Sequence, residues 1–168
     1  PISEVSINKK DHFQNISAAE YEISFINSEV KIKKLIKNSF YHEYYVEIFN
    51  RNTSGLVVFS SGSTGDNKAA VHDLDFIFEK FIKKRKCMRI VSFLLYDHLG
   101  GINTFLYSLS NGGCLIIPES RTPDSILKNI QDFKGELLPT SPSFINFILI
   151  SNKIPEYDLS SLKTISYG

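Results

Sequence analysis

The sequence predicts an α/β fold, a layered and mostly parallel β-sheet flanked by helices. From Leu56 onward, short runs rich in apolar and β-branched residues alternate with amphipathic helical segments, and this alternation is typical of layered α/β domains. The 168 residues fall in the usual size range of one domain, and 42% of them are hydrophobic, which is enough for a sizeable core. No internal repeat and no Pro/Gly-rich linker divides the chain.

The expected organisation is one globular unit spanning the whole chain, with two parts. Residues 53–168 form an α/β subdomain in this prediction, and residues 1–52 form a less clearly patterned upstream segment. Within that segment, residues 21–26 alternate like a strand, whereas residues 30–36 and 41–49 fit a strand or a helix equally well.

The first helix after the upstream segment is expected to begin beside Asp73, whose carboxylate can accept hydrogen bonds from the first backbone amides. A basic cluster at residues 83–86 suits the negative end of its dipole. Residues 90–95 then predict a buried strand. The apolar residues that recur at helical spacing, and are expected to face the core, are Leu74, Ile77, Phe78, Phe81 and Ile82.

A second helix is expected to end at Gly112, because glycine readily takes the left-handed conformation that closes a helix. Its predicted core-facing residues are Ile102, Phe105, Leu106 and Leu109. A strand at residues 114–118 follows, and Thr122 with Pro123 predicts the start of a third helix. The residues expected to face inward there are Ile126, Leu127, Ile130 and Phe133.

The last expected elements are a strand at residues 136–139, a helix that starts at Ser141 and Pro142, and a strand at residues 162–167. The helix is apolar almost throughout residues 144–150, and a helix that is apolar all round needs protein on several sides. We therefore expect open apolar surface on this helix and at Ile165 in the last strand, and self-association through it.

Charge and cysteine usage exclude several classes of function. Lys and Arg number 19 against 18 Asp and Glu, a formal net charge of +1, so we expect no bulk attraction to nucleic acid or to an anionic membrane. No apolar stretch has the length of a membrane span, and the first residues lack the basic and apolar regions of a signal peptide. Cys87 and Cys114 are isolated from each other and from clustered histidines, so we expect no metal site, no disulfide framework and a cytoplasmic location.

The strongest functional signal is a hydroxyl- and glycine-rich segment that follows an apolar run and ends on a lysine, Phe59-Ser60-Ser61-Gly62-Ser63-Thr64-Gly65-Asp66-Asn67-Lys68. Its glycines let the backbone approach a ligand closely, so that successive N–H groups converge on an anion. Its hydroxyls add donors and its lysine adds a point charge. A polar surface turn uses the same residue types, but the preceding strand and the lysine favour a phosphate-binding loop. Walker and dinucleotide patterns do not fit, because the required glycine spacings are missing.

The order of these residues resembles the phosphate-binding signature of the adenylate-forming superfamily, which includes acyl-CoA synthetases, aryl-acid ligases, luciferases and the adenylation domains of peptide synthetases. Asn67 stands where that family usually has proline, and Ala69 where a glycine commonly follows the lysine. The resemblance runs from about residue 53 to residue 168 and implies part of the large N-terminal domain of such an enzyme. The residues that it assigns to the phosphates of ATP are Ser60, Ser61, Gly62, Ser63, Thr64, Gly65 and Lys68.

A second segment, residues 93–101, resembles the place where these enzymes hold a histidine or an aromatic residue beside the carboxylate substrate. His98 is the candidate catalytic residue there. A structural interpretation stays equally open, in which Asp97 caps the following helix and His98 merely fills the turn. Asp97 also lies one place away from where amino-acid-activating relatives often hold a carboxylate for the substrate amine.

A third segment, residues 159–168, resembles the stretch that leads into the adenine-binding turn of the family, so Tyr167 and Gly168 would border the adenine pocket. The resemblance implies that a small carboxylic acid attacks the α-phosphate of ATP, with Mg²⁺, and that the acyl adenylate passes to a thiol such as CoA or phosphopantetheine. The family's later adenine, ribose and catalytic-lysine motifs do not occur in these 168 residues. We therefore expect a fragment that is inactive by itself.

Two other interpretations stay open. The chain could be a non-catalytic α/β module that binds a nucleotide or a protein partner through the same loop. The Ser/Gly loop could also be an inert turn, in which case ATP and pyrophosphate would leave the melting temperature unchanged.

Overall fold

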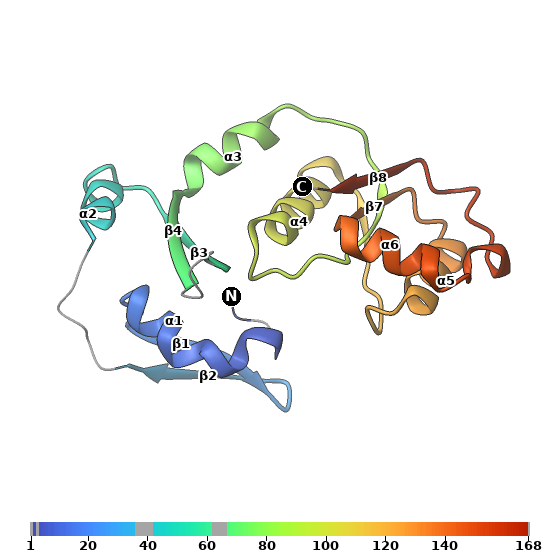
Figure 1. The fold of residues 1–168 in the computed structure, drawn as a ribbon. Helices are drawn as coiled ribbons and strands as arrows, with labels where there is room; N and C mark the ends of the chain where they lie inside the picture. The colour runs from blue at the N-terminus through green and yellow to red at the C-terminus, as the bar shows by residue number, and fades with distance from the viewer. Residues whose placement is uncertain (1, 3, 36–41, 62–66, 168) are drawn as a thin grey trace. The chain divides into compact units, whose positions relative to one another are not determined.

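The computed structural model describes residues 2, 4–35, 42–61 and 67–167. Its elements group into two compact units, Ile2–Phe78 and Glu79–Gly168. Figure 1 draws the first unit in blue to green and the second in green to red. The subdivision after residue 52 that the sequence indicates stays a prediction.

In the first unit, a helical segment packs on one face of an antiparallel β-hairpin. Glu22 on the hairpin accepts hydrogen bonds from Lys10, at 2.9 Å, and from Gln14, at 3.1 Å. The strand expected at residues 21–26 is confirmed, and residues 30–34 of the next ambiguous segment are strand. The elements are the 3-10 helix η1 (Glu4–Lys9), α1 (Lys10–Ile16), β1 (Tyr21–Ile26) and β2 (Glu29–Lys34).

The other face of this hairpin is apolar and exposed. Ile23 lies opposite Ile32, and Phe25 lies opposite Val30. These four residues are 62%, 67%, 77% and 56% exposed, respectively. Because directly opposite residues of an antiparallel pair share a face, they form one continuous apolar patch.

A second hairpin carries the hydroxyl-rich segment between its strands. The strands β3 (Gly55–Ser61) and β4 (Asn67–Asp73) pair antiparallel, and they are preceded by α2 (Glu43–Asn50) and followed by α3 (Leu74–Ile82). Within the ambiguous segment 41–49, residues 43–49 are helical, and residue 41 lies outside the described residues. The strand β4 was not predicted, because its alanines carry little strand preference.

Helix α3 begins as expected. The Asp73 carboxylate accepts a hydrogen bond from the backbone N–H of Asp75 at 2.9 Å. The predicted burial is right for Ile77, which is 8% exposed, and wrong for Phe78 and Ile82, which are 44% and 81% exposed. The helix spans nine residues, and Ile77 is its one buried residue among those that the structure describes.

The second unit is built on a four-stranded parallel sheet in the order β6-β5-β7-β8. This confirms the α/β class. The strand expected at residues 90–95 is shorter, because the chain leaves the sheet after Val91 to form the turn that leads into α4. The elements are β5 (Arg89–Val91), α4 (Leu99–Asn111), β6 (Cys114–Ile116), α5 (Pro123–Phe133), β7 (Leu137–Thr140), α6 (Pro142–Ile150), the 3-10 helix η2 (Ile154–Glu156) and β8 (Thr164–Tyr167).

The main core of this unit lies between the sheet and the helices α5 and α6. Its buried members are Val91, Ile116, Ile126, Leu127, Ile130, Leu138, Phe144 and Ile148. The two helices begin at the predicted caps, where Thr122 Oγ1 accepts from the N–H of Ser125 and Ser141 Oγ accepts from the N–H of Phe144. The predicted burial of Phe133 is wrong, because its side chain is 54% exposed at the helix end.

Helix α4 buries a different face from the predicted one. Its buried residues are Gly101, Thr104, Ser108 and Asn111, whereas Phe105 and Leu109 are 40% and 62% exposed. Small side chains allow close approach: a Cβ added at Gly101 would lie 2.0 Å from the carbonyl oxygen of Leu95. The predicted end at Gly112 is confirmed by its left-handed conformation, with φ of 65°.

Candidate functional site

The antiparallel register of β3 and β4 brings Ser60 and Lys68 together. Their Cα positions are direct partners, and Ser61 is the partner of Asn67 at the loop end of the hairpin. Opposite residues of such a pair have Cβ atoms about 4.5–5.5 Å apart. The hairpin therefore places the side chains of Ser60 and Lys68 on the same face, one on each side of the intervening segment.

The central part of the predicted phosphate loop lies outside the described residues. This applies to Gly62, Ser63, Thr64 and Gly65, and also to Gly168 at the predicted adenine site. Ser61 is described as the last residue of β3. The phosphate-binding role of all these residues stays a prediction.

Lys68 also lines a cavity of about 510 Å³ beside the second hairpin. Its other lining residues are Ile16, His42, Tyr44, Tyr45, Ala69 and Val71. The Tyr45 hydroxyl donates to the carbonyl oxygen of Ser17 at 3.3 Å, and burial raises its pKa. The cavity thus combines one cation with aromatic walls.

A second cation reaches the loop end of this hairpin from the start of the chain. The Lys9 ammonium donates a hydrogen bond to Asn67 Oδ1 at 3.0 Å. Sequence reasoning missed Lys9, because nothing in the local pattern of residues 4–9 indicates a partner so distant in the chain.

In the second unit, His98 is the N-cap residue of α4, and its side chain makes no capping hydrogen bond. Its Nε2 lies 3.7 Å from Asp97 Oδ1, and its side chain is 57% exposed, whereas that of Asp97 is 5% exposed. His98, rather than Asp97, occupies the N-cap position of α4. An exposed imidazole beside a buried carboxylate is available to a ligand or to solvent, and the catalytic role of His98 stays a prediction.

The strand order creates a switch point at the carboxyl ends of β5 and β7. From β5 the chain moves to β6 on one side and then returns to β7 on the other side. In open α/β sheets, ligands bind in the crevice outside such a point. Sequence reasoning did not single out its polar residues, because each is one ordinary hydroxyl next to a strand.

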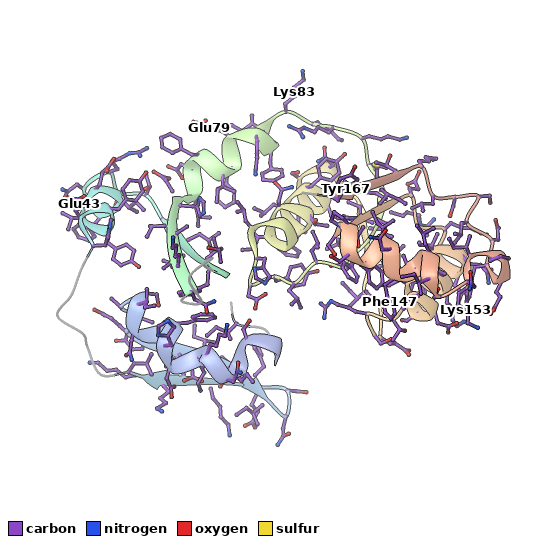
Figure 2. All side chains as sticks on the ribbon, viewed as in Figure 1. Glu43, Glu79, Lys83, Phe147, Lys153 and Tyr167 are labelled. Carbon is purple, nitrogen blue, oxygen red and sulfur yellow. The ribbon has the colours of Figure 1, made fainter. Side chains whose placement is uncertain are left out.

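Those residues are Ser92, which follows β5, and Thr140, which ends β7. The Ser92 and Tyr96 hydroxyls are hydrogen-bonded at 2.7 Å. Thr140 is 2% exposed, and its hydroxyl has no hydrogen-bond partner among the residues that the structure describes. The neighbouring strand ends on Tyr167, the partner of Thr140 in the register, which is 68% exposed and labelled in Figure 2.

The described part of the chain has neither a cluster of metal-ligating side chains nor a helix that could span a membrane. No group of three or more His, Cys, Asp or Glu side chains is placed there to hold a metal ion. None of the helices described is long and apolar enough to cross a membrane.

The parallel sheet with its switch point defines an α/β protein with an open sheet. The model of the AMP-binding enzyme family matches residues 6–168. The chain belongs to this family.

Individual relatives agree with this assignment. A luciferin 4-monooxygenase from Photuris pensylvanica is 28% identical over 155 residues, which cover 84% of this chain and 27% of the relative. The natural red emitting luciferase from Phrixothrix hirtus has a TM-score of 0.58 at 26% identity, over 67% of this chain and 23% of that one. The amide bond synthetase McbA from Marinactinospora thermotolerans has a TM-score of 0.55 at 25% identity, over 67% of this chain and 24% of that one. The chain spans about a quarter of the length of these relatives.

Proposed function

We propose that this chain carries the ATP-phosphate site of an ATP-dependent ligase that activates a small carboxylic acid. Membership of the AMP-binding enzyme family supports the proposal. The observation that carries it is the register pairing of Ser60 with Lys68 at the loop end of β3 and β4. A hydroxyl donor beside an ammonium group suits phosphate oxygens, because charge-assisted hydrogen bonds to anions are among the strongest in proteins.

In the proposed reaction, a carboxylate oxygen of the substrate forms a bond to the α-phosphorus of ATP. The bond from that phosphorus to the oxygen that bridges to the β-phosphate breaks, and pyrophosphate leaves. Ser60, Ser61, residues 62–65 and Lys68 hold the β- and γ-phosphates, where negative charge develops on the leaving group. Positioning and charge neutralisation supply most of the catalysis in such transfers, and Mg²⁺ bound with ATP would add to that neutralisation.

The remaining site residues have supporting roles in this proposal. His98 lies beside the carboxylate substrate, and Tyr167 with Gly168 borders the adenine. The acyl group then passes from the adenylate to a thiol, that of CoA or of phosphopantetheine, with release of AMP. We also place the protein in the cytoplasm, where Cys87 and Cys114, both free thiols in the structure, stay reduced.

The test is ATP–pyrophosphate exchange and ligand binding with the 168-residue chain. We expect ATP and inorganic pyrophosphate to raise the melting temperature, because a ligand at 100 times its Kd stabilises a protein by about 2.7 kcal/mol. Lys68→Ala should remove most of that shift. We expect little exchange with any acid in a panel of carboxylic acids, and robust exchange would show that the chain is active by itself.

Two results would count against the proposal. If ATP and pyrophosphate leave the melting temperature unchanged, the hydroxyl-rich segment is an inert turn. If they bind, but a longer protein that contains this chain still catalyses no exchange, the chain is a non-catalytic nucleotide-binding module.

A further inference from the structure

Lys9 and Asn67 meet at the loop end of the second hairpin, although they lie far apart in the sequence. The Lys9 ammonium is 3.0 Å from Asn67 Oδ1. Lys9 is the last residue of η1, and Asn67 is the first residue of β4. This contact lies within one compact unit of the structure.

An aromatic pair, the buried Phe13 and the half-buried Phe59, holds Lys9 in this place. Phe13, one helical turn after Lys9, is 4% exposed, and its ring stacks on that of Phe59 with centroids 3.9 Å apart and an angle of 8° between planes. Phe59 directly precedes Ser60 on β3. Stacked aromatic pairs add about 0.5–1.5 kcal/mol to the burial of their area, so α1 is fixed against the strand that leads to the proposed phosphate site.

Asn67 and Lys68 are consecutive strand residues. Their side chains therefore project from opposite faces of the β3–β4 hairpin. Asn67 binds the Lys9 ammonium on one face of the hairpin. The Lys68 side chain projects from the other face, so one lysine lies on each face next to the loop.

Lys9 has a neutral hydrogen-bond partner, whereas the neighbouring lysine, Lys10, has a charged one. Lys10 pairs with the carboxylate of Glu22 at 2.9 Å, so its charge is largely compensated. An amide oxygen, in contrast, orients the Lys9 ammonium without cancelling its charge. Proline, the usual residue of the family at position 67, has no side-chain acceptor and could not make this contact.

We propose that Lys9 is a second cationic contact for the polyphosphate of a nucleotide bound at this hairpin, and that Asn67 is the positioning residue for its ammonium. The inference rests on the function proposed above. In it, Asn67 holds the Lys9 ammonium through this hydrogen bond, and Lys9 adds a charge from outside the loop. The two lysines together attract the phosphate tail and the leaving pyrophosphate.

The test measures Kd for inorganic pyrophosphate and for ATP by calorimetry at several salt concentrations. Lys9→Gln should raise both Kd values roughly fivefold, as expected when one exposed charge near a polyanion is removed. It should also flatten the dependence of Kd on salt, which a purely structural role would not change. Lys9→Arg should bind like the wild type.

Asn67→Ala should produce part of the same loss, and it should add nothing in the Lys9→Gln background, because Asn67 acts through Lys9. Lys31→Gln is the matched control. Lys31 is an exposed lysine on β2 whose register partner is Ser24, and it takes no part in the contact of Lys9 with Asn67. Its loss removes the same charge as Lys9→Gln and should leave Kd unchanged apart from a small salt-dependent effect.

The outcomes separate the two proposals. If Lys68→Ala weakens binding while Lys9→Gln behaves like Lys31→Gln, the inference about Lys9 is wrong and the phosphate site stands. If additive losses are found for Lys9→Gln and Asn67→Ala, the positioning role of Asn67 is wrong. If the wild type binds neither ligand, both proposals are wrong.

Discussion

Arg51 and Asp73 form an ion pair, with Nη1 and Oδ2 2.7 Å apart, where β4 ends and α3 begins. The Asp73 side chain is 1% exposed and that of Arg51 is 38% exposed. The same carboxylate accepts hydrogen bonds from the Thr53 hydroxyl, at 3.3 Å, and from the backbone N–H of Asp75. The Arg51 guanidinium also lies over the ring of Phe76, 4.7 Å from its centroid. One buried carboxylate thus ties the second hairpin to the helix that follows it.

We predict that Asp73→Ala lowers the free energy of unfolding by about 3 kcal/mol, because it removes a helix cap and the partner of a partly buried charge. Urea unfolding followed by circular dichroism measures the change. Asp75→Ala is the control. Asp75 is an exposed aspartate in the first turn of α3, and its loss should lower the free energy of unfolding by about 0.5 kcal/mol. Equal losses in the two variants would contradict the central role of Asp73.

Because α4 lies close to the preceding turn, we predict that alanine substitutions at the adjacent Gly100 and Gly101 lower the free energy of unfolding by different amounts. Gly101→Ala should destabilise the protein by about 3 kcal/mol, because its new Cβ would lie 2.0 Å from the Leu95 carbonyl oxygen and the backbone must move. Gly100→Ala should cost less than about 1 kcal/mol, since its Cβ meets only Leu94 Cδ1 at 3.0 Å, which can rotate away. Thermal unfolding of the two variants checks this order, and the reverse order would show that α4 packs differently.

Acid should lower the free energy of unfolding, partly because Asp158 becomes protonated. Hydrogen bonds from Ser160, and then from Lys134, lower the pKa of this carboxyl from 3.8 to about 2. A depressed carboxyl pKa stabilises the folded state above the unfolded pKa, and that contribution is lost as the pH falls through the folded value. We therefore expect the unfolding free energy to fall between pH 4 and pH 2.

The control for this prediction is Asp158→Asn, which cannot titrate. Its unfolding free energy should depend less on pH across the same interval than that of the wild type. Urea titrations at a series of pH values measure both. Identical pH profiles would show that Asp158 makes no such contribution.

Exposed apolar side chains predict self-association. Phe25 on the first hairpin is 77% exposed and Ile150 on α6 is 76% exposed, and Phe147, labelled on α6 in Figure 2, is 53% exposed. Phe25→Glu and Ile150→Glu should each raise the protein concentration at which larger species form, as measured by sedimentation velocity. A monodisperse monomer of the wild type at high concentration would contradict this prediction.

Local signals in the sequence were sufficient for much of the second unit. The caps at Thr122 and Ser141 and the helix end at Gly112 depend on hydrogen bonds and backbone conformations within a few residues. The same is true of the strand that precedes the hydroxyl-rich segment. The phosphate-binding residues were predicted on the same kind of evidence, because a glycine-rich segment between a strand and a lysine is a local pattern, and their role stays a prediction.

Other features depend on contacts between distant parts of the chain. The buried face of α4 is made of small polar residues rather than of Phe105 and Leu109, because close helix packing at Gly101 outweighs hydrophobic periodicity. The contact of Lys9 with Asn67 depends on how α1 stacks on β3, which no local pattern expresses.

By itself, the sequence determined the α/β class and the places where most helices begin and end, since each follows from steric and hydrogen-bonding preferences of neighbouring residues. Only the tertiary structure decided the strand order, the pairing of Ser60 with Lys68 and the position of Lys9. The physical reason is that pairing and packing choose among many contacts that local preferences leave almost equal in free energy.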